Sequence, residues 1–225
     1  MSSEVAICNL ALSHIGDTAV VSSIDPPEGS AQSEHCARFY PIARDALQEL
    51  HAWGFCTTRA PLALLSLSTP QWQFVYSAPN GVIMYIDVIP PDAQDDYSQG
   101  GPYPADSVGL SVPCIVPVAG SYVPQRFQVE TLDGQDVVLT NQPNAVLRYT
   151  RKVTDSSKFS ALFTLALSHL LASMLAGPVI KGDAGKAEAK AQMQLFQAAL
   201  SKAVSSDAGD RNIKPTQLVP WMSGR

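Results

Sequence analysis

The sequence contains few charged residues. Asp, Glu, Lys and Arg make up only 16% of its 225 residues, whereas soluble proteins average about 25%. The 15 basic and 20 acidic residues give a net charge of −5, which argues against a general nucleic-acid binder with a basic patch. A hydrophobic content of 46% excludes an intrinsically disordered chain. The low charge is explained either by a surface that meets other protein molecules or by a solvated surface rich in Ser, Thr and Gln.

Prolines are rare outside the middle of the chain. Eleven of the 17 lie between Pro61 and Pro143, and Pro178 is the only one between Asn144 and Lys214. Because proline disrupts the interior of a helix, this distribution predicts helical ends and a non-helical middle.

Apolar residues recur with helical spacing on both sides of that middle block. The pattern predicts helices over residues 3–15, about 31–51, about 155–176 and about 183–205. Residues expected in the apolar stripes of the first and fourth helices include Cys8, Leu12, Met193 and Phe196, and residues expected on the solvated side of the second include Arg44 and Gln48. Pro41 lies inside the second of these, so we expect a kink or a two-piece helix near Phe39–Tyr40. Gly177-Pro178 is expected to end the third helix.

Apolar residues recur at every second position between Pro61 and Thr150, which is typical of strands. Asn80-Gly81 is a candidate tight turn, and Asp133-Gly134 is a stronger hairpin signal. The Gly- and Pro-rich segment Pro90–Pro104 predicts a loop. The expected strands are 72–76, 82–88, 126–131, 136–140 and 145–150.

Helices at both ends of a β block predict an α+β fold. We expect a helical bundle built from the N- and C-terminal helices, an inserted, mainly antiparallel β domain, and an extended C-terminal tail. The expected divisions are 1–60 and 151–206 for the two parts of the bundle, 61–150 for the β domain and 207–225 for the tail.

The third expected helix is apolar almost all round. However, a polar row of Ser160, Thr164 and Ser168 favours a central bundle helix over a membrane span, so no membrane association is expected. The segment Met1–Gly16 lacks the basic start of a secretory signal, and we therefore expect synthesis in a reducing cytoplasm.

Cysteine and histidine show no metal-binding or redox spacing. The chain has neither a Cys-x-x-Cys nor a His-x-x-x-His motif, so free thiols are expected and no metal or cofactor is. The residues concerned are Cys8, Cys36, Cys56, Cys114, His14, His35, His51 and His169.

Catalytic motifs are weak. Asp95-Asp96 and the pair Asp133 and Asp136 resemble the paired carboxylates of glycosidases, but Asp is also chosen in turns for local hydrogen bonding. No Gly-x-Ser-x-Gly motif of a serine hydrolase is present. The glycines around Lys186 resemble a broken phosphate loop, in which Ala187 replaces the Ser or Thr that would bind magnesium. We therefore expect no catalytic, cofactor-binding or metal residues.

Tryptophans mark one candidate core position and one candidate binding position. Trp53 follows the second expected helix and is expected in the core. Trp221 lies four residues from the C-terminus within the apolar cluster 218–222. Such a residue either anchors a partner or folds back onto its own bundle, and the residues alone leave both open.

Short segments along the chain occur in an order that is shared with a known family. These segments are Ala6–Leu12, Ile15–Asp17, Phe39–Pro41, Ala43–Leu47, His51–Cys56, Arg59-Ala60, Trp72–Tyr76, Arg148–Thr150, Val153–Asp155, Leu170–Ala172 and Leu175-Ala176. With them the chain resembles the tail tubular protein A family, the head-to-tail adaptor or connector of short-tailed bacteriophages (podoviruses). The resemblance spans nearly the whole chain, is most specific over Ala6–Ala60 and Arg148–Gln197, and is weakest in the β block.

The resemblance implies a structural virion protein at the head–tail junction. Twelve copies would form a ring between the portal protein and a tail nozzle similar to tail tubular protein B, with attachment for tail fibres. Genome DNA would pass through the lumen without specific binding, which a net charge of −5 suits. No cofactor or catalysis is implied.

The C-terminal tail is the expected portal-binding segment within this resemblance, with Trp221 as anchor. Two other functions stay open at this point: a virion-associated hydrolase of peptidoglycan or capsule polysaccharide that uses Asp95, Asp96, Asp133 or Asp136, and a bacterial helical binding module. The expected portal-binding residues are Lys214, Pro215, Leu218, Val219, Pro220, Trp221 and Met222.

Overall fold

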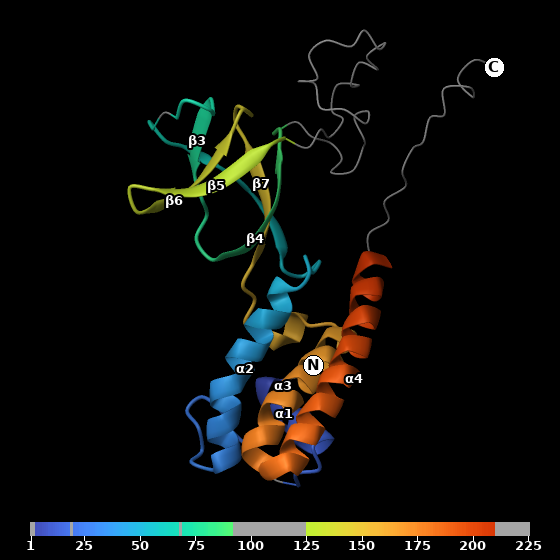
Figure 1. Ribbon diagram of the computed structural model, residues 1–225. Coiled ribbons are helices and arrows are strands. Elements are labelled where there is room, and N and C mark those ends of the chain that lie inside the picture. Colours follow the sequence, from blue (N-terminus) through green and yellow to red (C-terminus); the bar gives the residue numbers. More distant parts are fainter. Residues whose placement is uncertain (1–2, 19, 68, 92–124, 210–225) are drawn as a thin grey trace, which may run out of the picture. The chain divides into compact units, whose positions relative to one another are not determined.

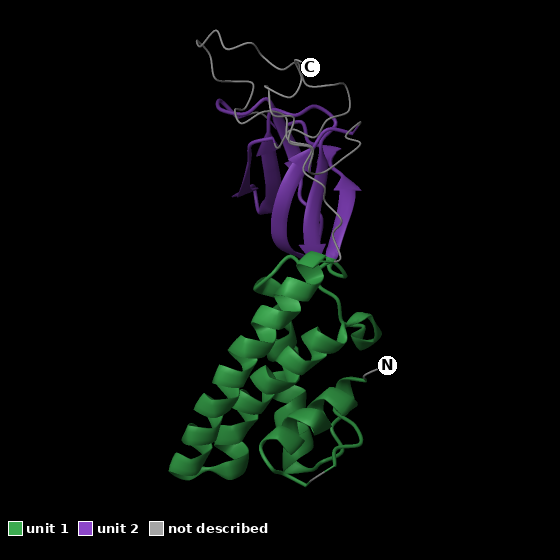
Figure 2. Ribbon diagram, turned by 90° about the vertical axis from the view of Figure 1, so that its right-hand side faces the viewer, with its two compact units in different colours: residues 1–56, 152–211 green, residues 57–151, 212–225 purple. Residues whose placement is uncertain are grey.

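The computed structural model describes residues 3–18, 20–67, 69–91 and 125–209, and the statements below concern these residues. They form an α+β protein, as the sequence predicts. The chain divides into two compact units. Unit 1 combines the residues up to Cys56 with those from Lys152 onward, and unit 2 is formed between Thr57 and Arg151 (Figure 2).

Unit 1 is built from helices of both ends of the chain (Figure 1). Three serines cap its helices, because each hydroxyl accepts a hydrogen bond from a backbone N–H of the first turn: Ser3 for α1, Ser30 for α2 and Ser160 for α3. The helices are α1 (Glu4–His14), α2 (Ala31–Glu49), a short 3-10 helix η1 (Ser156–Lys158), α3 (Ala161–Ile180) and α4 (Gly182–Gly209).

Helix α3 is the centre of unit 1 and contacts α1, α2 and α4. By length and composition alone α3 is apolar enough to cross a membrane, but half of its most apolar window is buried inside the protein. Phe163 is fully buried and meets the rings of Trp53 and Phe55 edge-on, each with a centroid separation of 5.0 Å. The burial expected for Trp53 is confirmed, since only 1% of it is exposed.

Unit 2 contains two antiparallel sheets. One has the strand order β1-β7-β4 and the other β2-β3-β6-β5. One apolar cluster combines side chains of both sheets, among them Leu147 and Val88 of the first and Tyr76 and Val138 of the second. A smaller cluster of Val75, Val137 and Leu139 comes from the second sheet alone. The strands are β1 (Thr57–Pro61), β2 (Ala63–Leu64), β3 (Phe74–Ser77), β4 (Val82–Ile89), β5 (Phe127–Leu132), β6 (Gln135–Thr140) and β7 (Val146–Arg151).

The two-piece form expected for the second helix and the end expected for the third helix at Gly177-Pro178 are both wrong. Helix α2 continues through Pro41 as one helix, and α3 continues through Gly177-Pro178 as far as Ile180. Gly177 has no Cβ to collide with the proline ring, which removes part of the usual restriction on the residue before proline. The end of α3 is set instead by Lys181, whose φ of 63° is left-handed.

The beginning of the third helix and the end of the fourth also differ from the prediction. Asp155 caps η1, and α3 begins only at Ala161. Helix α4 runs to Gly209, so the prediction that the extended tail begins at position 207 is wrong. Asp207 is held in the last turns of α4 by contacts that are described below.

One of the two turn predictions is confirmed as a hairpin. Asp133 and Gly134 have φ values of 50° and 78° and connect the paired strands β5 and β6. Gly81 also has a positive φ, 73°, and forms a turn with Asn80. However, β3 and β4 on either side of that turn belong to different sheets, so Asn80-Gly81 is a crossover between sheets and not a hairpin.

Candidate interaction site

The residues expected to bind a portal lie outside the described residues. The same holds for Asp95, Asp96, Cys114 and all of the expected loop Pro90–Pro104 beyond Pro91. The described chain ends at Gly209, at the C-terminal end of α4.

The end of α4 is tied to the segment that follows α2. Oδ1 of Asp207 accepts a hydrogen bond of 2.8 Å from the backbone N–H of Gly54. Oδ2 of Asp207 lies 3.1 Å from Nε2 of His51. The side chains of Asp207 and His51 are only 14% and 23% exposed. This carboxylate therefore fixes the last turns of α4 immediately before the expected tail begins.

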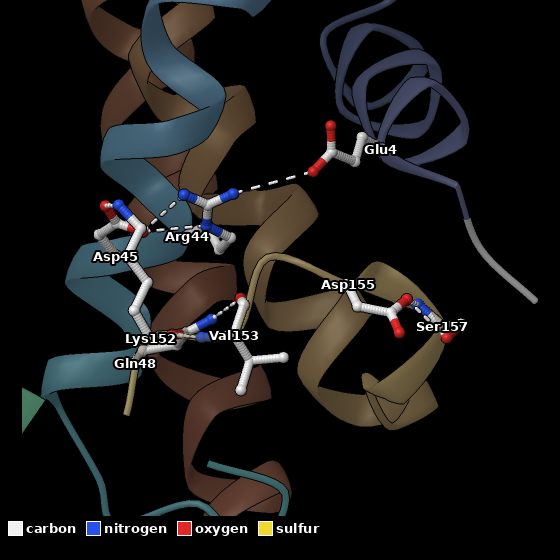
Figure 3. Close-up of polar contacts among 8 residues, drawn as sticks. All are labelled: Glu4, Arg44, Asp45, Gln48, Lys152, Val153, Asp155 and Ser157. Carbon is white, nitrogen blue, oxygen red and sulfur yellow. Dashed lines mark hydrogen bonds and ion pairs between the residues drawn. The ribbon is translucent and has the colours of Figure 1, made fainter. Parts of the chain in front are cut away.

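The chain passes from unit 1 to unit 2 after Cys56 and returns to unit 1 after Arg151. Near each of these two crossings, a polar side chain of unit 1 makes a hydrogen bond within that unit. The indole N–H of Trp53 donates to the carbonyl of Leu47 at 2.9 Å, just before the first crossing. The amide of Gln48 donates to the carbonyl of Val153 at 2.7 Å and accepts from its N–H at 3.1 Å, just after the second crossing (Figure 3). Gln48 is fully buried, although the sequence pattern placed it on the solvated face of its helix.

Arg44 connects α1 to α2 within unit 1 (Figure 3). Its guanidinium lies 2.9 Å from the Asp45 carboxylate and 3.8 Å from that of Glu4. Asp45 also pairs with Lys152, the first residue of unit 1 after the second crossing. Arg44 is 6% exposed, which corrects its expected place among the solvated residues of its helix: the carboxylates of Asp45 and Glu4 allow it to be buried.

A second polar network lies between α1, α3 and α4. The Ser168 hydroxyl donates to the carbonyl of Leu165 at 2.8 Å, so it accepts from Nε2 of His14 at 3.1 Å. The rings of His14 and His169 stack with centroids 4.2 Å apart. Burial and the charge of His169 lower the pKa of His14 below its ordinary value of 6.5.

Gln192 completes this network from α4. Its Oε1 accepts from Nδ1 of His169 at 2.8 Å. Its Nε2 donates to the carbonyl of His14 at 3.2 Å and to the carboxylate of Glu188 at 2.7 Å. Gln192 is 4% exposed. The sequence pattern identified none of these partners, because they come from three separate segments.

Buried thiols and histidines form no metal site in the described part of the chain, where no group of three His, Cys, Asp or Glu side chains could hold an ion. Cys8, Cys36 and Cys56 are buried, and none of the three is in a disulfide. A hydrogen bond with Cys36 and burial raise the pKa of the Cys8 thiol, so this thiol is a poor nucleophile.

The predicted carboxylates of the hairpin have different surroundings. Asp136 lines a polar pocket of about 300 Å³ in unit 2, and Asp133 is not among its lining residues. Oδ1 of Asp136 accepts from the Thr131 hydroxyl at 2.8 Å. The pocket therefore holds a single carboxylate, and the geometry of paired catalytic carboxylates is not formed by Asp133 and Asp136 there.

The outward face of α4 is exposed and almost uncharged. Between Ala191 and Ser206 the only charged residue is Lys202. Leu195 is 49% exposed and Met193 39% exposed, which corrects the expectation that Met193 belongs to the buried stripe. The exposed positions with helical spacing on this face are Ala184, Ala187, Ala191, Leu195, Ala198, Lys202 and Ser205.

Comparison with known proteins assigns no family to this chain. No family model matches it, and no curated protein matches it.

Proposed function

We propose that this protein is a structural virion component, the head-to-tail adaptor of a short-tailed bacteriophage. Copies of it form a ring between the portal and the tail nozzle, the genome passes through the ring, and tail fibres attach to it. The observation that carries the proposal is the chain-wide resemblance that begins at Ala6 and continues beyond Arg148. Its place of action is the head–tail junction, after synthesis in the host cytoplasm.

Two structural features support an assembly role. Unit 1 is made from both ends of the chain with a β unit inserted between them, which is the architecture that the resemblance implies. The outward face of α4 carries one charged residue between Ala191 and Ser206. A low charge is typical of the central part of protein interfaces, so this face suits contact with protein.

The tail residues 214–222 are the proposed contact with the portal. In this proposal Trp221 fills an apolar pocket of the portal, because a buried tryptophan is among the strongest contributors to interface affinity. Asp207 fixes the end of α4 through Gly54 and His51, so the tail would begin from a defined point on unit 1.

The decisive experiment mixes the purified full chain with the assembled portal protein encoded by the same genome. Light scattering coupled to size-exclusion chromatography then measures the mass of the complex and of each protein alone. The proposal expects a portal complex with as many copies of the adaptor as of the portal, twelve. A chain that stays at its free mass in the presence of portal would contradict it, and so would a genome without portal and nozzle genes near this one.

A further inference from the structure

The polar pocket of unit 2 is formed where the chain crosses from one sheet to the other. Its walls come from the end of β3 with the following turn, the first part of β4, and the beginning of β6 after the β5–β6 hairpin. The lining consists of Ser77, Ala78, Pro79, Asn80, Gly81, Val82, Tyr85, Gly134, Gln135 and Asp136.

The pocket has space because small residues form the turns that line it. Gly81 and Gly134 have φ values of 73° and 78°, and a left-handed backbone favours glycine at both positions. The backbone N–H of Ala78 donates to the carbonyl of Asp136 at 2.9 Å, which joins the two sides of the pocket. The pocket is thus a product of sheet pairing and turn geometry rather than of a loose loop.

The chemistry of the lining excludes several kinds of ligand. Asp136 is its only charged residue, and no cation lines it, so an anion such as phosphate would be repelled. An apolar ligand would displace water from the polar lining and offer no hydrogen bonds in its place, which is unfavourable. A guanidinium or ammonium group only donates hydrogen bonds, so it would pair with Asp136 but could not engage the amide N–H groups of Asn80 and Gln135, which are exposed and would stay hydrated.

A group that both donates and accepts fits all of these residues. Side-chain amides offer paired donors and acceptors, and a carboxylate accepts from two hydroxyls. Among the described residues, hydrogen bonds engage only Oδ1 of Asp136, through Thr131. Tyr85 packs partly against the apolar cluster that both sheets form, and burial together with the charge of Asp136 raises its pKa. Its phenol is therefore neutral near pH 7 and contributes both an apolar ring and a hydroxyl.

We infer that this pocket binds a neutral saccharide, with Asp136, Asn80 and Gln135 as its hydrogen-bonding residues. The inference is independent of the proposed function. It describes binding and not hydrolysis, because the pocket has one carboxylate, whereas glycoside hydrolysis ordinarily requires two.

The test begins with the full-length protein on an array of neutral oligosaccharides. The strongest binder is then titrated against the ¹⁵N-labelled chain and followed by NMR, alongside N-acetyl-L-arginine amide and inorganic phosphate. We expect saturable shifts for residues 77–82 and 134–136 with the saccharide only. Absence of binding across the array, or shifts of these residues with the arginine derivative or phosphate alone, would overturn the inference.

Variants of the lining complete the test. Asp136→Asn and Gln135→Ala should each weaken saccharide binding, Asp136→Asn by about tenfold or more because a charge-assisted hydrogen bond is lost. The matched control is Asp133→Asn, which removes a carboxylate three positions away and keeps a residue that tolerates the positive φ of this turn. If all three variants bound the saccharide with the same affinity as the unmodified protein, the saccharide would bind elsewhere and the inference would be overturned. Release of reducing ends that Asp136→Asn abolishes would make the site catalytic and contradict the binding-only assignment.

Discussion

The side chain of Gln48 exchanges two hydrogen bonds with the backbone of Val153, although 105 positions separate the two residues. The Gln48 amide thus pairs with both the N–H and the carbonyl of Val153, as the backbone of a neighbouring strand would, at the point where the chain returns to the helices. Both partners are buried, so water does not compete for these groups. This contact fixes where the second half of unit 1 begins.

Replacing Gln48 by Met should lower the free energy of unfolding of unit 1 by about 2–4 kcal/mol. Met keeps the length of the side chain but leaves the N–H and carbonyl of Val153 buried without partners, and each such group costs about 1–3 kcal/mol. Urea denaturation followed by circular dichroism measures the change. Gln197→Met on the exposed side of α4 is the control and should change stability little. A loss equal to that of the control would mean that water reaches Val153.

Removing the Asp207 carboxylate should loosen the end of α4. Asp207→Ala deletes the acceptor of Gly54 N–H and the partner of His51, at an expected cost of about 1–3 kcal/mol. Hydrogen exchange should show faster opening of residues 203–209, with the rest of α4 less affected. Ser206→Ala, at an exposed neighbouring position, serves as the control. Unchanged exchange at the helix end would show that helix propensity alone holds it.

The stability of unit 1 should fall as the pH drops below about 6.5. The pKa of His14 is lowered from 6.5 in the folded protein by burial and by His169. Between the lowered pKa and 6.5 the unfolded chain binds more protons, so stability rises with pH in this window and levels off above it. His14→Gln should flatten the profile of unfolding free energy between pH 5 and 7. His35→Gln, outside the network, should retain the slope.

Gly185 should not tolerate a methyl group. A Cβ at this position would lie 2.8 Å from the backbone oxygen of Ala176, so Gly185→Ala must displace α4 from α3 and should cost about 1–3 kcal/mol. On helix propensity alone the same change would stabilise by about 0.5–1 kcal/mol. Ala184→Gly at the exposed neighbouring position measures that propensity term. If Gly185→Ala raised the thermal midpoint, the close approach of the helices would not limit this site.

Deletion of Lys214–Arg225 should abolish binding to the portal and leave the unfolding free energy unchanged. Trp221→Ala in the full chain should weaken binding by about 30-fold, the effect of losing a dominant interface tryptophan of about 2 kcal/mol. Gln217→Ala is the control within the same segment. Equal affinity of the truncated and full chains for portal, measured by surface plasmon resonance, would refute the anchoring role of the tail.

Periodicity predicted the helices and most strands, because an element that buries one face has apolar residues at its own repeat, which is 3.6 residues in a helix and two in a strand. The stripe of Cys8 and Leu12 in α1 is buried as expected, as is Phe196 in α4. Proline rules failed at Pro41 and Pro178, where both helices continue. At these positions packing against the rest of unit 1 outweighs the local cost of a missing hydrogen bond.

The candidate site was less accessible to sequence reasoning than the fold. Asp136 could be noticed as an acidic residue near a turn, but Asn80 and Tyr85 join it only because β3 and β4 separate into two sheets. Arg44 and Gln48 looked like solvated helix residues, and the burial of Gln192 was not predicted. Each is buried beside a partner from another segment, which is Glu4 for Arg44, Val153 for Gln48 and His169 for Gln192.

The amino-acid sequence by itself determined the α+β class and the Asp133-Gly134 hairpin, since these depend on interactions within a few residues. The tertiary structure alone decided where the Asn80-Gly81 turn meets β6, which polar residues enter the core and where α4 ends. Those outcomes depend on groups far apart in the chain, as Asp207 and Gly54 show, and a polar group is buried only where a distant partner completes its hydrogen bonds.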